Sequence, residues 1–118
     1  MYEYKNAINI LTNRFSEMEK EFLSDKDFYD DLPYIFYESV FEKYVVMQIE
    51  NKNVELMEKI FVFIEDILEI GDDELKELID VAAVESLFFE ENAKQLLKGA
   101  HRFFGKLTKL SFARFNNK

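Results

Sequence analysis

The sequence predicts an all-α fold of five to six helices, with a helical-hairpin architecture or an irregular bundle. Three observations lead to this prediction. Only three Gly and one Pro interrupt the 118 residues, apolar residues recur at helical spacing along most of the chain, and Gly71 separates two such segments. This length is typical of one domain, which we expect over residues 1–115, with residues 116–118 as a frayed tail.

The first helix is expected over about residues 4–23, because apolar residues recur there at steps of one, three and four positions. They are Ala7, Ile8, Leu11, Phe15, Met18 and Phe22. The polar stretch Ser24–Asp31 then ends the pattern, and Pro33 suits the first turn of the next helix.

The segment from Pro33 to about Lys52 allows two interpretations. The run Tyr44–Met47 is typical of a strand, because it is rich in β-branched and aromatic residues. An isolated strand needs a partner, however, and the sequence nearby offers none. We therefore expect a helix, central to the fold because it is apolar on nearly every side. Its predicted stripe is Phe36, Val40, Tyr44 and Met47.

Residues 54–70 and 72–89 are expected to form a helical hairpin with a very short turn at Ile70-Gly71-Asp72. Gly71 is the expected stop of the first helix, and Asp72 or Asp73 can cap the second. Glu74 follows in the first turn, where the helix dipole favours a negative charge. The predicted core of the hairpin is Phe61, Ile64, Leu68, Leu78, Ile79 and Leu87.

Two shorter segments complete the prediction. A helix from Glu91 to Lys98 is expected to end at Gly99, with Ala93, Leu96 and Leu97 directed inward. A last amphipathic segment follows, weakened by Gly105. Its apolar residues are Phe103, Phe104, Leu107, Leu110 and Phe112.

Part of this pattern resembles known helical proteins. The order Glu65-Asp66-Ile67-Leu68, Gly71-Asp72-Asp73-Glu74, Leu75, Ala82-Ala83 and Leu87 resembles one HEAT-type hairpin. More loosely, Leu32-Pro33, Phe36, Phe61, Ile64-Glu65, Gly71-Asp72 and Val84-Glu85-Ser86-Leu87 resemble an uncharacterised family of small bacterial helical proteins. Some members lie near polymorphic-toxin genes and are suspected immunity proteins. The resemblance covers about residues 10–105 and carries over no catalytic or binding residue.

The charges are distributed unevenly along the chain. Residues 1–91 hold all 24 acidic residues and eight of the 15 basic ones, a net charge of -16, whereas residues 92–118 hold seven basic residues and no acidic one. Together they give the chain its net charge of -9. Opposed blocks of this kind are typical of an interaction surface, or of a tail that folds back on its own acidic body.

The residue types in this sequence do not predict a catalytic site. The absence of Cys excludes thiolate metal sites and cysteine nucleophiles. His101, the sole histidine, has no His, Asp or Glu three or four positions away, and the three scattered glycines cannot assemble a phosphate-binding loop. We therefore expect no enzyme, no catalytic residue, no cofactor and no bound metal.

The N-terminus lacks the basic stretch and apolar run that mark a signal peptide. Nowhere do enough apolar residues follow one another to span a bilayer. We therefore expect a cytoplasmic protein that does not engage a membrane.

Two acidic clusters are the candidate partner-binding residues. The first is Asp25, Asp27, Asp30 and Asp31, and the second is Asp72, Asp73 and Glu74. Both lie at chain reversals, where side chains can project toward a partner, and such charges speed the association with a basic protein. The sequence thus favours a non-catalytic protein-binding domain, such as an immunity-type inhibitor of a basic toxin or effector. The competing interpretation is a solubilising coat that also caps helices.

The alternative function uses the basic segment at residues 94–118, where Lys and Arg alternate with Phe103, Phe104, Phe112 and Phe115. Such a segment can contact phosphates and stack on bases, as in a nucleic-acid-associated helical module or regulatory subunit. In the structural interpretation, its aromatic residues enter the core and its cations rest on the acidic body. The acidic pI of about 4.6 favours the structural interpretation.

Overall fold

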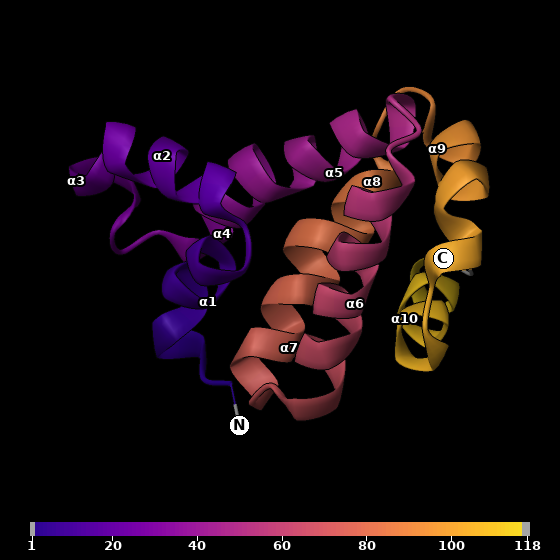
Figure 1. Ribbon diagram of the computed structural model, residues 1–118. Helices are drawn as coiled ribbons and strands as arrows, with labels where there is room; N and C mark the ends of the chain where they lie inside the picture. Colours follow the sequence, from indigo (N-terminus) through magenta and orange to yellow (C-terminus); the bar gives the residue numbers. More distant parts are fainter. Residues whose placement is uncertain (1, 117–118) are drawn as a thin grey trace.

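The computed structural model describes residues 2–116, and the side chains of residues 2–115. Over these residues the fold is all-α, as predicted, and it consists of eight continuous helices rather than five or six (Figure 1). Of the predicted frayed tail, only the backbone of Asn116 falls within the description, where it ends the last helix, and residues 117–118 lie outside it.

The first half of the chain begins with a 3₁₀ turn at Tyr4–Asn6 and continues into α1 (Ala7–Arg14), α2 (Ser16–Ser24) and α3 (Lys26–Tyr29). The short helix α3 lies inside the stretch that was predicted only as a polar break. A longer helix follows, made of α4 (Pro33–Phe36), a π-helical turn (Tyr37–Phe41) and α5 (Glu42–Glu50).

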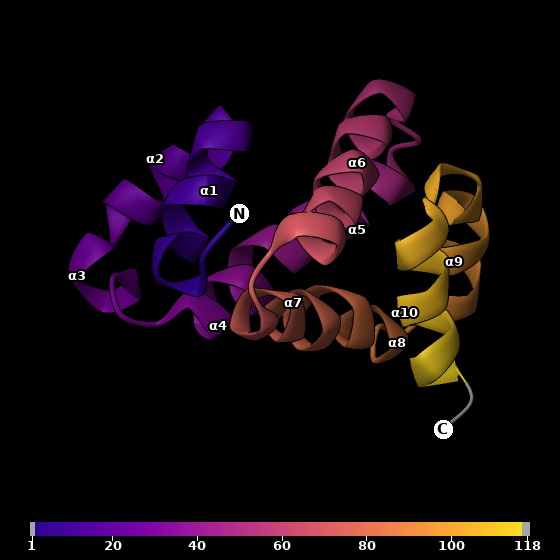
Figure 2. The ribbon, with the colours of Figure 1, turned by 90° about the horizontal axis from the view of Figure 1, so that it is seen from below.

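The second half contains the hairpin. Its first helix is α6 (Val54–Ile70), and its second runs through α7 (Asp73–Ile79), a π-helical turn (Asp80–Glu85) and α8 (Ser86–Phe88). The chain then forms α9 (Ala93–Ala100), a 3₁₀ turn (His101–Phe103) and α10 (Lys106–Asn116). Figures 1 and 2 show α1–α4 on one side of the hairpin and α9 and α10 on the other.

The predicted hairpin is therefore confirmed, and it forms the middle of an irregular bundle. Asn53 caps α6 by accepting a hydrogen bond from the Leu56 amide, and Asp72 caps α7 in the same way. Of the six predicted core residues, Leu68 is only partly buried and the other five are fully buried.

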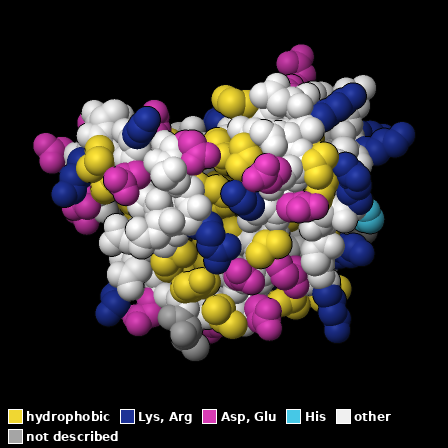
Figure 3. Space-filling model, viewed as in Figure 1, with side chains coloured by type: hydrophobic (Ala, Val, Ile, Leu, Met, Phe, Trp, Pro, Cys, Tyr) yellow, Lys and Arg dark blue, Asp and Glu magenta, His cyan; other side chains and the backbone are white. Residues whose placement is uncertain are grey.

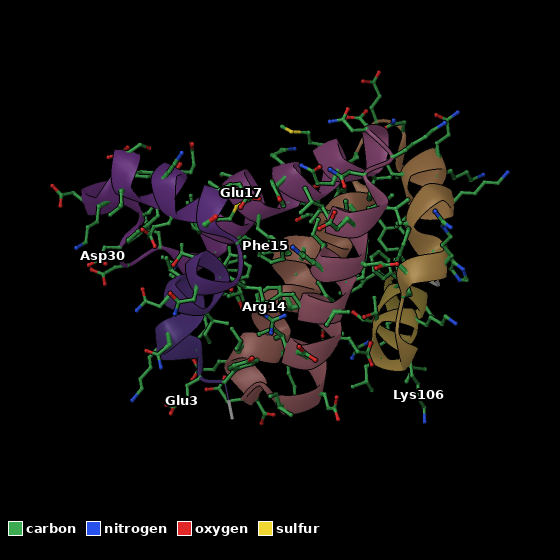
Figure 4. The ribbon with its side chains drawn as sticks, in the orientation of Figure 1. Glu3, Arg14, Phe15, Glu17, Asp30 and Lys106 are labelled. Carbon is green, nitrogen blue, oxygen red and sulfur yellow. The ribbon has the colours of Figure 1, made fainter. Side chains whose placement is uncertain are left out.

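The predicted N-terminal helix is wrong in one respect, because Phe15 interrupts it. Phe15 adopts φ -129° and ψ 100°, an extended conformation that separates α1 from α2. Its ring packs edge-on against Phe63 of α6 at 5.6 Å between centroids, and it is tilted against the ring of Phe41 at 6.1 Å. Figure 4 shows Phe15 on the side of the N-terminal helices that faces α6. The predicted apolar face remains buried along both helices.

The predicted stripe of the following helix is displaced, although the choice of helix over strand is confirmed. A π-helical turn closes its hydrogen bonds one residue later than an α turn, so the stripe moves by about one position. Met47 is 54% exposed, and the helix is therefore not buried on every side. The buried residues are Phe36, Tyr37, Phe41, Glu42, Val45, Gln48 and Ile49.

The last helix also differs from the prediction, because Gly105 precedes α10 rather than weakening it. A Cβ atom at Gly105 would collide with the Glu65 carboxylate, which accepts hydrogen bonds from the amides of Leu107 and Thr108 at 3.0 and 2.9 Å. Glu65 thus caps α10 from another helix. The buried face of α10 includes the polar Thr108 and Ser111, and the predicted Leu110 is 56% exposed.

No helix among residues 2–116 is both long and apolar enough to cross a bilayer.

Replacing Phe15 with Ala is expected to lower the free energy of unfolding by about 3–5 kcal/mol, because the substitution removes a buried ring that contacts several helices. The control is Val62→Ala on α6, whose side chain is 55% exposed and whose loss is expected to cost less than about 0.5 kcal/mol. Chemical denaturation of both variants measures the difference. Equal values for the two variants would contradict the role given to Phe15.

Candidate functional site

The first acidic cluster surrounds the short helix α3. Asp25, Asp27, Asp30 and Asp31 are all exposed, and Asp25 does not cap α3 with its side chain. Among the described residues, none of the four carboxylates accepts a hydrogen bond or forms a salt bridge. Figure 4 shows Asp30 at the outer end of the N-terminal helices. These carboxylates are therefore available to a partner.

The second cluster contains one residue that the fold itself uses. One oxygen of the Asp72 carboxylate accepts a hydrogen bond from the Leu75 amide at 2.9 Å, and the other accepts one from the Tyr4 amide at 3.0 Å. The backbone of Tyr2 pairs with the same turn, donating to Ile70 and accepting from Asp72. Asp72 thus fastens the N-terminal segment to the hairpin, and within this cluster Asp73 and Glu74 are the exposed carboxylates.

Gly71, which ends α6, lets the N-terminal segment approach the turn of the hairpin closely. It ends α6 with φ -77°, so the left-handed conformation of a usual glycine stop is not adopted. A Cβ atom at Gly71 would lie 2.6 Å from the Ile67 carbonyl oxygen, too close for any other residue. The glycine therefore allows a close backbone approach beside Tyr2, with which it forms an isolated parallel bridge.

Tyr4 lies between part of the first cluster and one residue of the second, because it lines a cavity with Asp30 and Asp31 and also experiences the charge of Glu74. Tyr4 and Tyr34 lie 6.2 Å apart between ring centroids. Tyr4 also lines a cavity of about 340 Å³ together with Asp30 and Asp31, whereas Asp25 and Asp27 are not among its lining residues. Burial and then the charge of Glu74 raise the pKa of Tyr4. We call Tyr4, Tyr34, Asp30, Asp31, Asp73 and Glu74 the acidic face.

A further carboxylate extends this face along α7. Burial raises the pKa of Tyr34, and the negative charge of Glu77 raises it further. Carboxylates of α7 therefore raise the pKa of both tyrosines. The carboxylates of Asp30 and Asp31, which follow α3, line the cavity beside Tyr4. Sequence reasoning missed the two tyrosines, because nothing in their spacing shows that residues 4 and 34 meet.

The opposite side of the molecule carries the basic face, which we define as Lys94, Lys98, Arg102, Lys106 and Lys109. All five side chains are exposed, and none forms a salt bridge within the described part of the chain. Figure 3 shows Lys and Arg side chains gathered along the edge that α9 and α10 form, with the histidine among them. Figure 4 shows Lys106 at the start of α10.

The expectation that these cations rest on the acidic body is therefore wrong for most of them. Of the Lys and Arg side chains among residues 94–115, only Arg114 forms a salt bridge, with Asp80 at 2.9 Å. The aromatic part of the same expectation holds for Phe104 and Phe112, which are 8% and 6% exposed and enter the core.

One carboxyl group lies in the core, and nothing in the sequence distinguished it from a surface glutamate. Glu42 is 1% exposed, and its Oε1 atom has no hydrogen-bond partner among the described residues. Burial, and then a hydrogen bond with Glu90, raise the pKa of Glu42 to about 8, while Lys43 opposes the shift. Hydrogen bonds from Glu42 and Lys43 hold the pKa of Glu90 below its ordinary range. This cluster joins α5 to the segment between α8 and α9.

His101 is exposed and lies 5.4 Å from the ring of Phe104. Within the described residues, no group of three or more His, Asp or Glu side chains is arranged to hold a metal ion.

A comparison with known domain families finds a match over nearly the whole chain. Residues 8–117 match a family described as a domain of unknown function (DUF7674). The match covers nearly all of the basic segment, of which the resemblance over residues 10–105 left residues 106–118 outside. No curated protein and no solved structure matches the chain.

Replacing Glu42 with Gln is expected to make stability less dependent on pH. Because the pKa of Glu42 is raised in the folded state, its neutral form stabilises the fold fully below its unfolded pKa, and this contribution is lost as the pH rises toward about 8. The wild type should therefore lose a few kcal/mol relative to Glu42→Gln between pH 5 and pH 9, at about 1.4 kcal/mol per pKa unit. The control is Glu55→Gln, at an exposed position. Parallel stability curves from denaturation at each pH would refute this account.

Proposed function

The chain belongs to the DUF7674 family of domains of unknown function, and from this premise we propose that it is a non-catalytic domain that binds a basic protein through the acidic face. The observation that carries the proposal is that Asp30 and Asp31 line a cavity with Tyr4, which packs against Tyr34 and also experiences the charge of Glu74. Residues from distant parts of the sequence thus form one surface with one chemistry.

The acidic face suits the side chains of Lys and Arg in two ways. Its carboxylates are exposed and unpaired within the described residues, so they can form charge-assisted hydrogen bonds with a cation. The tyrosine rings supply π faces on which a cation gains about 0.5–2 kcal/mol. The cavity of about 340 Å³ beside Tyr4 gives such a side chain a place to enter. One cation lies there already, since Lys5 lines the cavity and contacts Glu3 at 3.4 Å.

Long-range electrostatics support the same partner. Residues 1–91 carry a net charge of -16, counted from 24 acidic and eight basic residues. A field of this sign attracts a basic protein and raises the association rate more than the final affinity. Added salt should weaken the effect, because the screening length falls to about 10 Å at 0.1 M.

More specifically, we propose that the partner is a basic toxin or effector. This chain would then be its immunity-type inhibitor in the bacterial cytoplasm. An inhibitor needs a complementary surface and no chemistry of its own. The resemblance to small proteins encoded near polymorphic toxins supports this form. Co-expression with a toxin encoded beside the gene tests it directly, because an inhibitor should restore growth and an unrelated domain should not.

The alternative function, a nucleic-acid-associated module that uses residues 94–118, has one observation in its favour. The five cations of the basic face are exposed and unpaired among the described residues. Against it, the rings of Phe104 and Phe112 stack on each other at 4.4 Å and are buried, so they cannot stack on bases. Binding to a single-stranded oligonucleotide, with a steep salt dependence, would favour this alternative.

Reversing four charges of the acidic face should slow the capture of a partner. The variant is Asp30→Lys, Asp31→Lys, Asp73→Lys and Glu74→Lys, and it leaves Asp72 in place because Asp72 holds the N-terminal segment. The association rate constant is expected to fall about tenfold or more at low salt, because attraction becomes repulsion. Stopped-flow mixing measures it, with a partner captured by the wild-type chain and then purified.

The control carries the same change of charge elsewhere, as Glu50→Lys, Glu55→Lys, Glu58→Lys and Glu91→Lys. These residues are exposed, and Glu55 lies in the first turn of α6 as Glu74 lies in the first turn of α7. The helix-dipole effect on folding is thereby matched for one of the two first-turn carboxylates that the first variant changes. If both variants associate equally slowly, net charge rather than the acidic face controls binding. If the first variant associates at the wild-type rate, the acidic face is not the binding surface.

A further inference from the structure

A groove opens on the basic side of the molecule, between α8, α9 and α10. Its volume is about 550 Å³, within the range of roughly 300–1,000 Å³ that is usual for sites that bind small molecules. Apolar side chains form its floor and cationic side chains form its rim. No step of the proposed function uses this groove.

The floor is aromatic and fixed in place by the core. The rings of Phe104 and Phe112 stack at 4.4 Å with an angle of 15° between their planes, and Phe88 lies 5.8 Å from Phe112. Because Phe104 and Phe112 are largely buried, their orientation does not depend on a ligand. Their remaining exposed edges, with Leu97, present apolar surface at the bottom of the groove.

The rim combines three lysines from two helices. Lys94 and Lys98 lie one turn apart on α9, and Lys109 approaches from α10. No acidic residue lines the groove. Across the described chain none of the three lysines forms a salt bridge, although the sequence carries 24 acidic residues. A cationic rim above an apolar floor is complementary to a molecule with an anionic head and an apolar body.

We propose that this groove binds an amphipathic carboxylate of the fatty-acid class. The carboxylate lies between Lys98 and Lys109, where charge-assisted hydrogen bonds reach it from both helices. The hydrocarbon chain lies on Phe88, Phe104 and Phe112, where burial of apolar surface stabilises it. Three cations on the rim favour the carboxylate over a neutral lipid of equal chain length.

Nucleic acid fits the groove less well than a fatty acid does. A nucleic-acid strand would have to follow the whole basic face, whereas Lys106 and Arg102 do not line the groove. Arg102 instead lies over the ring of Phe103 at 4.6 Å. The stacked rings on the floor have no free face for a base, but their edges suffice for a hydrocarbon chain.

Isothermal titration of the full chain with dodecanoate, below its micelle concentration, tests the proposal. We expect saturable binding with one site, and binding of dodecanol that is at least tenfold weaker. Lys98→Glu with Lys109→Glu should weaken dodecanoate binding about tenfold or more and leave dodecanol binding unchanged. The matched control, Lys20→Glu with Lys26→Glu, changes the same number of exposed charges on α2 and α3 and should leave both unchanged.

A second variant blocks the groove without changing a charge. Ala113 is exposed and lines the groove, so Ala113→Phe fills it from the surface of α10. This variant should abolish binding of both ligands while the circular dichroism spectrum and melting temperature stay unchanged.

Three results would overturn the proposal. One is no saturable binding of dodecanoate, and another is equal weakening by the control variant. The third is displacement of dodecanoate by a single-stranded oligonucleotide with higher affinity, which would assign the basic face to nucleic acid instead.

Discussion

The burial of Phe63 is the contact on which the rest of the bundle depends. This residue of α6 is fully buried, and its ring meets the rings of Phe15 and Phe41 edge-on or tilted at 5.6 Å each. It thereby joins the N-terminal helices, the long helix of α4 and α5, and the hairpin. Arg14 covers the same ring at 5.3 Å and contacts Asp66 on α6 at 3.1 Å.

Periodic features of the sequence predicted the fold where the structure is itself periodic. The α6–α7 hairpin, with its stop at Gly71, was predictable because the buried residues of α6 follow the helical repeat and the Asp72 cap of α7 is local. The break at Phe15 was not predictable, because Phe15 packs against Phe63, a residue distant in the sequence. Nor did the apolar spacing indicate the π-helical turn at Tyr37–Phe41. The same holds for Gly105, whose neighbour is Glu65, 40 positions earlier.

The candidate site was predictable in composition but not in geometry. The carboxylates stood out as clusters in the sequence, yet two facts emerged only in three dimensions. The Asp72 carboxylate accepts a hydrogen bond from the amide of Tyr4. Tyr4 also lines a cavity with Asp30 and Asp31 and experiences the charge of Glu74. The burial of Glu42 was not predictable from the sequence either. A glutamate between Phe41 and Lys43 is typical of a helix surface, and only the packing of the fold buries it.

The separation of the two faces gives the molecule a large permanent dipole moment. The acidic face belongs to the N-terminal helices and the start of α7, whereas the basic face lies along α9 and α10 (Figures 1 and 3). In the field of a charged body such a molecule experiences a torque as well as a force, so it turns before it touches. An anion-exchange surface would therefore hold it in the opposite orientation to a cation-exchange surface, although its net charge is -9 in both cases.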